Sequence, residues 1–320
     1  MRTSRTLALG AALLALVMSA CAPGGGGTSP GETQPAAGGT VSIGSQDFYE
    51  AQLMAEIYAQ ALENAGFTVE REFPSGTREA TWPALSGGQF DMMPEYIGSL
   101  TAFLEGEASG DPEETYNALL ELVEAEGLTA LDYTEAQDQN AFVVRSDTAE
   151  EFGLTTMSDL AAVATDLVWG LPPECETNPL CAGVAPEGSE EREGGLAEYG
   201  INFDELEIEP LAACDAPIAT ALNDGVVDVA ELCSTQPDIE RFNFVRLEDD
   251  MQTQPAENIA PVISQAKLDE LGDGFADVLN AVSAEMTTED LTSLGVQVAV
   301  EQRDVAEVAT EWLTDKGLLD

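Results

Sequence analysis

Strands and amphipathic helices alternate along the chain from residue 41 onward, and this alternation constrains the fold more than any other feature. Apolar and polar residues alternate over 41–43 and again over 67–73, as expected for strands. Between them, residues 53–62 carry an apolar face with helical spacing, and Gly66 ends the helix. A strand, a helix and a strand in this order predict a right-handed βαβ unit with a parallel sheet.

The same kind of alternation continues through the rest of the chain. Further helices are expected at 79–85, 113–126, 158–164 and 218–223, and further strands at 90–93, 141–144, 167–170, 226–232 and 258–264. Thr287 and Asp290 form a capping-box pattern, and Val308 and Trp312 belong to an apolar stripe near the C-terminus. With roughly 150 residues per domain, 320 residues predict two α/β lobes. Such a pair suggests a protein whose cleft closes on a ligand.

The charge balance excludes several functions. Eleven basic and 60 acidic residues give a formal net charge of −49, which would repel nucleic acid and anionic lipid headgroups. The chain has no histidine, which excludes Ser-His-Asp and Cys-His catalysis and His-ligated zinc. We interpret the acidity as a solvated coat. Calcium sites are the alternative, but no EF-hand pattern is present.

The first 39 residues have the layout of an exported, tethered protein. Arg2 and Arg5 precede an apolar run over 7–18 that is shorter than a membrane span, so residues 1–20 are expected to be a signal peptide. The run ends in Met-Ser-Ala-Cys, which resembles a bacterial lipobox and implies a lipid on Cys21. Residues 22–39 are rich in Gly and Pro and predict a flexible tether. The alternative is a secreted protein with a free Cys21.

Four further cysteines fit export to an oxidising compartment. We expect two disulfides, Cys175–Cys181 and Cys214–Cys233, because each pair lies within one local segment. Four cysteines allow three pairings, so the other two stay open. A metal site made of all four is the rival interpretation, but the short Cys-x2-Cys spacing of such sites is absent. No metal or cofactor is expected.

An ordered set of motifs resembles the glycine betaine/choline substrate-binding lipoproteins of ABC importers, over residues 41–320. The matching segments are GSQDFYE at 44–50, TRE at 77–79, WPAL at 82–85, DMMPEYIG at 91–98, DQN at 138–140, FVV at 142–144, PEC at 173–175, GVVD at 225–228, ST at 234–235, LEDD at 247–250 and TTED at 287–290.

The resemblance implies a two-lobed, type II periplasmic-binding-protein fold. Lobe 1 would comprise residues 40–138 and 253–320, and lobe 2 residues 139–252, joined by two hinge crossings. The protein would capture choline or glycine betaine by lobe closure, for osmoprotectant uptake, and would not be an enzyme. Its partners would be a membrane permease and a cytoplasmic ATPase, because this chain has no nucleotide-binding motif. We expect a monomer held on the extracytoplasmic face of the membrane by its lipid.

The chemistry of a quaternary ammonium group indicates which residues bind it. The group cannot donate conventional hydrogen bonds, so aromatic faces with a carboxylate nearby hold it best. By the resemblance, Tyr96 matches a position of the family's aromatic cage, and Phe48, Tyr49 and Tyr133 are further candidates at predicted strand ends. The polar candidates are Gln46, Thr77, Arg78, Asp138, Gln139, Asn140, Glu257 and Asn258. Some betaine-binding relatives carry lysine where this chain has Gln46, which favours choline.

Two departures and three alternatives stay open. Lobe 2 is poor in aromatic residues, and Cys214 matches nothing in the family pattern, so the sequence does not identify aromatic residues of lobe 2 that would complete a cage. The main alternative is a binding protein of the same fold for an amino acid or another small zwitterion. A glycosidase-like enzyme lacks any motif that would single out its carboxylates. A structural wall protein would show repeats, and none is evident.

Overall fold

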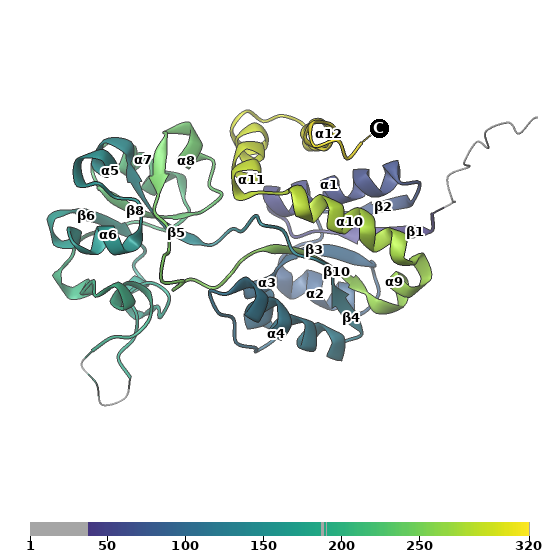
Figure 1. Ribbon diagram of the computed structural model, residues 1–320, viewed down its shortest axis with the longest axis horizontal. Coiled ribbons are helices and arrows are strands. Elements are labelled where there is room, and N and C mark those ends of the chain that lie inside the picture. The colour runs from purple at the N-terminus through teal and green to yellow at the C-terminus, as the bar shows by residue number, and fades with distance from the viewer. Residues whose placement is uncertain (1–37, 187–188, 190, 320) are drawn as a thin grey trace, which may run out of the picture. The chain divides into compact units, whose positions relative to one another are not determined.

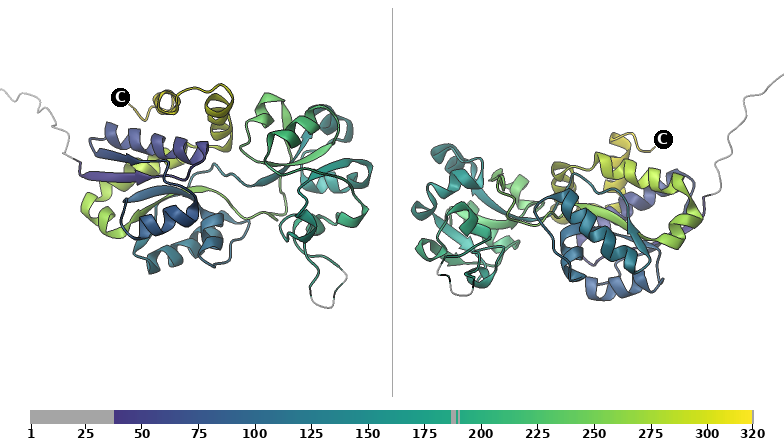
Figure 2. Two further views of the ribbon diagram at one scale, coloured as in Figure 1. Left: turned by 180° about the vertical axis from the view of Figure 1, so that it is seen from behind. Right: turned by 60° about the horizontal axis from the view of Figure 1, so that its bottom comes forward.

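Two five-stranded sheets, each covered by helices on both faces, organise the residues described by the computed structural model (Figures 1 and 2). The model describes residues 38–186, 189 and 191–319. The signal peptide, Cys21 and the tether up to residue 37 lie outside these residues. In the described part of the chain, no helix combines the length and the apolar character needed to cross a membrane.

The first sheet has the strand order β2-β1-β3-β10-β4. Its strands are β1 (Thr40–Gly44), β2 (Thr68–Glu72), β3 (Met92–Tyr96), β4 (Leu128–Ala130) and β10 (Ile259–Ser264). β1 pairs in parallel with β2 and β3, as the predicted βαβ unit requires, whereas β10 runs antiparallel to β3 and β4. The expected strand at 90–93 begins later, at Met92, and continues to Tyr96. This extension places Tyr96 opposite Ile259 of β10.

Two helical layers cover the first sheet. One layer contains α1 (Tyr49–Asn64), α9 (Gln265–Leu271), α10 (Asp273–Glu285), α11 (Thr288–Gly295), the π-helix η5 (Val296–Val300) and α12 (Val305–Asp315). The other contains α2 (Arg78–Ser86), α3 (Ile97–Phe103) and α4 (Pro112–Ala125). The capping box of Thr287 and Asp290 is present at the start of α11, and Val308 and Trp312 are buried in the core.

The second sheet has the order β7-β6-β8-β5-β9. Its strands are β5 (Asn140–Arg145), β6 (Val168–Leu171), β7 (Glu207–Pro210), β8 (Val229–Cys233) and β9 (Phe244–Arg246). Its helices are α5 (Ser146–Phe152), α6 (Met157–Ala161), α7 (Ala216–Asn223) and α8 (Asp238–Arg241), with short 3₁₀ turns at Ala164–Asp166, Cys175–Thr177, Gly195–Tyr199 and Phe203–Glu205. The expected helix at 158–164 is shorter, and its end becomes one of these turns.

Two chain segments connect the sheets and pair with each other. The first follows β4 and the second precedes β10 (Figure 1). Gln137 and Asn258 form an antiparallel bridge, and the amide of Asp138 donates to the carbonyl oxygen of Glu257 at 3.1 Å. Ser234, just after β8, exchanges backbone and side-chain hydrogen bonds with Gln139. The two crossings are therefore hydrogen-bonded to each other, and the first is also hydrogen-bonded to the residue that follows β8.

Both predicted disulfides are present, Cys175–Cys181 and Cys214–Cys233. Cys175 and Cys181 are buried in the core of the second sheet, beside Ala182 and Leu196. Cys233 is the last residue of β8, and Cys214 lies in the segment before α7. The second disulfide therefore fastens that segment to β8, whose following residue, Ser234, is hydrogen-bonded to the first crossing.

Candidate functional site

The candidate site lies at the carboxyl ends of β1, β2 and β3, where ligands gather in open α/β sheets. The loop after β1 carries Gln46 and Phe48, α1 begins with Tyr49, and Tyr96 ends β3. The amide of Ile97 donates to the carbonyl oxygen of Asn258 at 3.0 Å, so the second crossing reaches the same edge. Fold topology thus gathers segments that are far apart in the sequence.

Tyr96 and Phe48 form an aromatic pair at this edge. Their ring centroids are 5.9 Å apart and the rings are tilted by 35°. Tyr96 is almost fully buried, whereas Phe48 is 38% exposed. The hydroxyl of Tyr96 donates to Oε1 of Glu50 in the first turn of α1. The pair therefore offers one buried ring and one partly exposed ring, next to a buried carboxyl group.

Arg78 and Glu95 supply the polar side of the site. Nη2 of Arg78 lies 2.8 Å from Oε2 of Glu95, and Nε2 of Gln46 donates to the same oxygen at 3.3 Å. Burial raises the pKa of Glu95, although Arg78 opposes this shift. Thr77 is the N-cap residue of α2, and its side chain is exposed.

The second crossing adds another buried carboxyl group. Glu257 accepts hydrogen bonds from the amide of Ser99 at 2.9 Å and from its hydroxyl at 2.7 Å. Burial raises the pKa of Glu257 to about 7, and these hydrogen bonds oppose the shift. Asn258 donates to the carbonyl oxygens of Thr134 and Glu135. Glu257 and Asn258 are thus fixed by the backbone around them.

The first crossing is also acidic. The amide of Thr235 donates to Oδ1 of Asp138 at 3.3 Å, and burial raises the pKa of Asp138. Gln139 is held by Ser234, and Nδ2 of Asn140 donates to Oε1 of Glu231 at 2.9 Å. These contacts connect the first crossing to the end of β8.

Unpartnered polar atoms concentrate around the crossings. Six buried side-chain atoms lack a hydrogen-bond partner among the described residues. Four of them belong to this region: Oγ of Ser45, Oε2 of Glu50, Oε1 of Gln236 and Oδ1 of Asn258. An unpaired buried polar atom costs free energy, so such a concentration is typical of a site that a ligand completes.

The other two aromatic candidates, Tyr49 and Tyr133, pack against different parts of the protein. A Cβ added at Gly295 would lie 3.1 Å from the hydroxyl oxygen of Tyr49, so Tyr49 packs against the end of α11. Tyr133 packs against Tyr116 of α4 at a centroid distance of 5.1 Å, in the core on the other face of the first sheet. The structure thus brings Phe48, but not Tyr133, into ring contact with Tyr96 within the residues it describes.

A cavity of about 510 Å³ opens beside the crossings, in the described part of the chain. Its lining includes Gln139, Asn140, Ser234 and Arg246 but neither Phe48 nor Tyr96. Phe142 of the second sheet is part of this lining, whereas Trp169 is fully buried and packs edge-on against Phe142.

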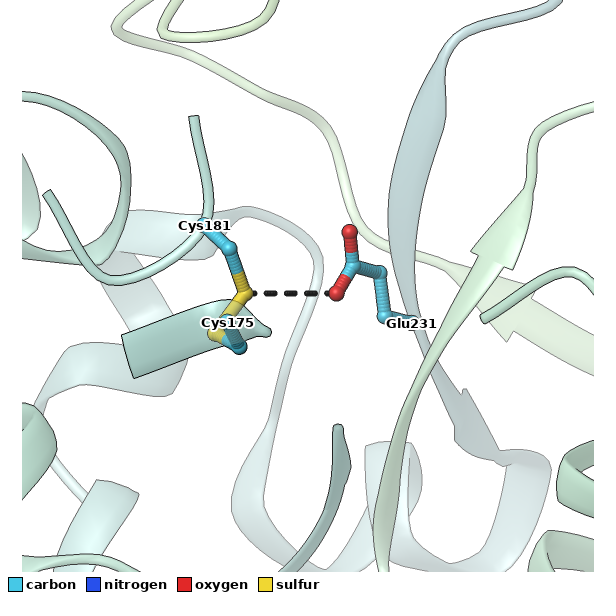
Figure 3. A group of neighbouring side chains, drawn as sticks. All are labelled: Cys175, Cys181 and Glu231. Atoms are coloured by element: carbon cyan, nitrogen blue, oxygen red, sulfur yellow. Dashed lines mark hydrogen bonds between the residues drawn. A yellow bond between two sulfur atoms is a disulfide. The ribbon is translucent and has the colours of Figure 1, made fainter. Parts of the chain in front are cut away.

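Glu231 is a buried carboxyl group in β8 of the second sheet. It is 2% exposed, and its Oε2 lies 3.3 Å from Sγ of Cys181 (Figure 3). A disulfide sulfur has no proton to donate, so this contact is a hydrogen bond only when Glu231 is protonated. Burial and the charge of Glu174 raise the pKa of Glu231 to about 7, which favours that form. Cys175, Cys181 and Glu231 are close enough to hold a metal ion, but the disulfide occupies both sulfurs.

Sequence reasoning missed Glu50, Glu95 and Thr235 as members of the site. A signal for Glu50 was present, because it precedes Leu53, Met54 and Ile57 by three, four and seven residues and thus lies on the apolar face of α1. Glu95 stands within an apolar run at the end of β3, all of it buried. Thr235 carries no comparable signal in the sequence.

Comparison with known proteins first defines the class. The fold matches solved substrate-binding proteins of transport systems: a glycine betaine/carnitine/choline ABC transporter protein (TM-score 0.74, 23% identity, 88% of this chain and 100% of that chain) and apo YehZ from Escherichia coli (TM-score 0.74, 24% identity, 87% and 99%). The chain is thus an α/β protein of the type II periplasmic-binding-protein fold.

The sequence then gives the family. Residues 39–315 match the model of the substrate binding domain of the ABC-type glycine betaine transport system, and the chain belongs to this family. It is 28% identical to a glycine-betaine-binding protein of Pseudomonas aeruginosa, over 88% of this chain and 89% of that protein. It is 26% identical to the carnitine transport binding protein OpuCC of Listeria monocytogenes, over 93% and 91%. The family consists of extracytoplasmic transport proteins and not of enzymes.

Proposed function

We propose that this chain captures a quaternary ammonium compound of the choline or glycine betaine type and delivers it to an importer for osmoprotectant uptake. The observation that carries the proposal is the aromatic pair of Tyr96 and Phe48, together with the buried carboxyl group of Glu50 that the Tyr96 hydroxyl contacts. A trimethylammonium group is attracted to aromatic faces, each contributing about 0.5–2 kcal/mol. A carboxylate near the rings adds charge attraction, which matters because a trimethylammonium group cannot donate conventional hydrogen bonds.

The ligand-binding set would extend from this pair to the surrounding loops. Tyr96, Phe48 and Tyr49 would supply aromatic surface, with Tyr133 as the outlying candidate. Gln46, Thr77, Arg78, Asp138, Gln139, Asn140, Glu257 and Asn258 would supply polar contacts. Support for the polar members is their position at one sheet edge and on the paired crossings, next to the unpartnered atoms.

Ligand capture would proceed by closure of two lobes. We assign residues 40–138 and 253–320 to lobe 1 and residues 139–252 to lobe 2, because strands of the first sheet come only from the former ranges and strands of the second only from the latter. The paired crossings at Gln137 and Asn258 would be the hinge. The closed protein would dock on a membrane permease driven by a cytoplasmic ATPase.

The protein would act as a monomer anchored through lipid on Cys21, on the extracytoplasmic face of the cell membrane. The support is the lipobox-like Met-Ser-Ala-Cys sequence and the Gly- and Pro-rich segment after it. A lipid and a flexible tether would keep the binding protein near its permease.

Calorimetric titration of the full-length chain with choline, glycine betaine, carnitine and several amino acids tests the proposal. We expect saturable binding of a quaternary ammonium compound and at least a tenfold loss of affinity in Tyr96→Ala, because the ring is removed. Tyr58→Phe is the matched control, since Tyr58 is a buried tyrosine of α1 whose hydroxyl pairs with Ser283. Binding of an amino acid alone, unaffected by Tyr96→Ala, would favour the zwitterion alternative and overturn the proposal.

A further inference from the structure

Glu50 is an unusual residue for the interior of a protein. Its side chain is 2% exposed, and it stands on the apolar face of α1. The hydroxyl of Tyr96 donates to Oε1, while Oε2 has no hydrogen-bond partner in the described structure. An ionised carboxylate with an unpaired buried oxygen is costly unless a positive charge lies close to it.

The groups that face Glu50 supply no such charge. Tyr49 of α1, Tyr96 of β3 and Thr235 after β8 are neutral, and Asp138 of the first crossing is a second acid. Asp238 of α8 adds a further acidic group facing Tyr49. Arg78 is the nearby cation of the site, but its guanidinium group is bound by Glu95 through Nε and Nη2. Glu50 therefore has acidic neighbours, and none of the groups that face it supplies a cation to pair with it.

This environment favours the protonated form of Glu50 as long as no cation lies against it. Burial is the main cause, and the nearby Asp138 adds to it, so the pKa of Glu50 rises to about 8 even though the hydroxyl groups of Tyr96 and Thr235 oppose the shift. At neutral pH the carboxyl group is thus mostly protonated. A cation placed against Tyr96 would reverse the balance, because an opposite charge within about 4–6 Å favours the ionised form.

We propose that Glu50 is the counter-charge that makes this site select a cation without a carboxylate of its own over a zwitterion, and that Glu50 releases its proton to solvent when that cation binds. The inference rests on the proposed function and deepens it by naming the charge class of the ligand. Choline carries one positive charge and no negative charge. Glycine betaine brings a carboxylate into a site that already holds Glu50, Glu95 and Asp138, with Arg78 as counter-ion for one of them.

The proposal fixes the direction of the pH dependence. The bound state needs ionised Glu50, whereas the free state is protonated below about pH 8. Choline affinity should therefore rise with pH, by up to roughly tenfold per pH unit below pH 8, and level off above it. Glycine betaine should bind at least tenfold more weakly than choline at pH 8.

Proton counting by calorimetry tests the proposal directly. Choline and glycine betaine are titrated into the full-length chain at pH 7 in two buffers that differ in ionisation enthalpy, so the difference in heat gives the protons released. We expect close to one proton per choline. Glu50→Gln should release none, lose the pH dependence and bind the two ligands with similar affinity. Glu56→Gln is the matched control, because Glu56 is buried on the same helix but paired with Arg71.

Each other outcome overturns a distinct statement. Choline binding without proton release in the unmodified chain, which needs no variant to fold, overturns the inference and leaves the proposed function standing. Proton release that persists in Glu50→Gln but disappears in Asp138→Asn assigns the proton to Asp138 and overturns the role of Glu50. Equal affinity for both ligands overturns the selection of a cation. Failure of every quaternary ammonium compound to bind overturns the proposed function, and the inference with it.

Discussion

Arg78 and Glu95 form an ion pair at the base of the candidate site, with Nη2 of Arg78 2.8 Å from Oε2 of a glutamate whose side chain is fully buried. Arg78 also donates through Nε to the same carboxylate at 3.1 Å. Glu95 comes from the end of β3 and Arg78 from the first residue of α2. The pair therefore fixes the start of one helix against the strand that ends in Tyr96.

Arg78→Met should destabilise the protein by about 3 kcal/mol, because it leaves the buried charge of Glu95 unpaired. Adding Glu95→Met to the same chain should recover much of this loss, since the unpaired charge is then removed. Urea unfolding monitored by circular dichroism measures both changes. Arg303→Met, which breaks the exposed pair with Glu311, is the control and should cost less than about 1 kcal/mol. A loss for Arg78→Met no larger than this control would contradict the prediction.

Gly98 is required by the close approach of the second crossing to α3. A Cβ added there would lie 2.6 Å from the carbonyl oxygen of Ala256 and 3.1 Å from Oε1 of Glu257. Gly98→Ala should therefore displace the crossing, cost about 1–3 kcal/mol and weaken ligand binding. Gly274→Ala in α10 is the control, because the added Cβ would contact nothing within 4 Å. Thermal unfolding and ligand titration compare them, and equal behaviour of the two variants would show that Gly98 is not constrained.

Local pattern was sufficient to predict most of the fold. The βαβ unit, the capping box at Thr287 and both disulfides are found as expected, because each depends on residues close together in the sequence. Several elements were not predicted, among them β4, β7 and α10, and others differ at their ends. The sequence placed the third strand at 90–93, but β3 runs through Pro94 to Tyr96, because pairing with β10 carries the strand onward.

A local sequence pattern could not predict which acidic residues are buried. Sixty acidic residues look alike in the sequence, and only tertiary packing decides which of them lose contact with solvent. The burial of Glu50 could have been predicted from the sequence, because Glu50 shares the helical face of Leu53 and Ile57. Tyr133 illustrates the opposite limit. It was a candidate because it was expected at a strand end, and it packs against Tyr116 on the other face of the sheet.

The two disulfides should differ in how much they stabilise the fold. Cys214–Cys233 closes a span of 19 residues and Cys175–Cys181 a span of 6. The loop-entropy model gives about 3 kcal/mol for the longer span and about 2 kcal/mol for the shorter one. Paired replacement by serine, followed by urea unfolding, measures each. Because Cys233 directly precedes Ser234, which binds the first crossing, only the loss of Cys214–Cys233 should also weaken ligand binding. Equal binding by both variants would argue against that coupling.

Glu231 should make the protein less stable as pH rises. Its folded-state pKa is about 7, against an ordinary value of 4.5, so between these values the folded protein binds more protons than the unfolded chain. The free energy of unfolding then falls with increasing pH across this window, by about 3 kcal/mol in total for this one group. Glu50 and Glu257 act in the same direction, so the contribution of Glu231 must be isolated by substitution.

Glu231→Gln isolates it, because the glutamine amide can accept from Asn140 and donate towards Cys181 as the protonated acid does. The free energy of unfolding of this variant minus that of the unmodified chain should therefore increase by about 2–3 kcal/mol from pH 5 to pH 8. Urea unfolding at both pH values measures the gain. Glu150→Gln on the exposed face of α5 serves as the control and should change the pH dependence little, because Glu150 stays in contact with solvent. A Glu231→Gln variant whose stability parallels that of the unmodified chain at both pH values would mean that Glu231 ionises in the folded protein as it does in solvent, and that its contact with Cys181 is not a hydrogen bond.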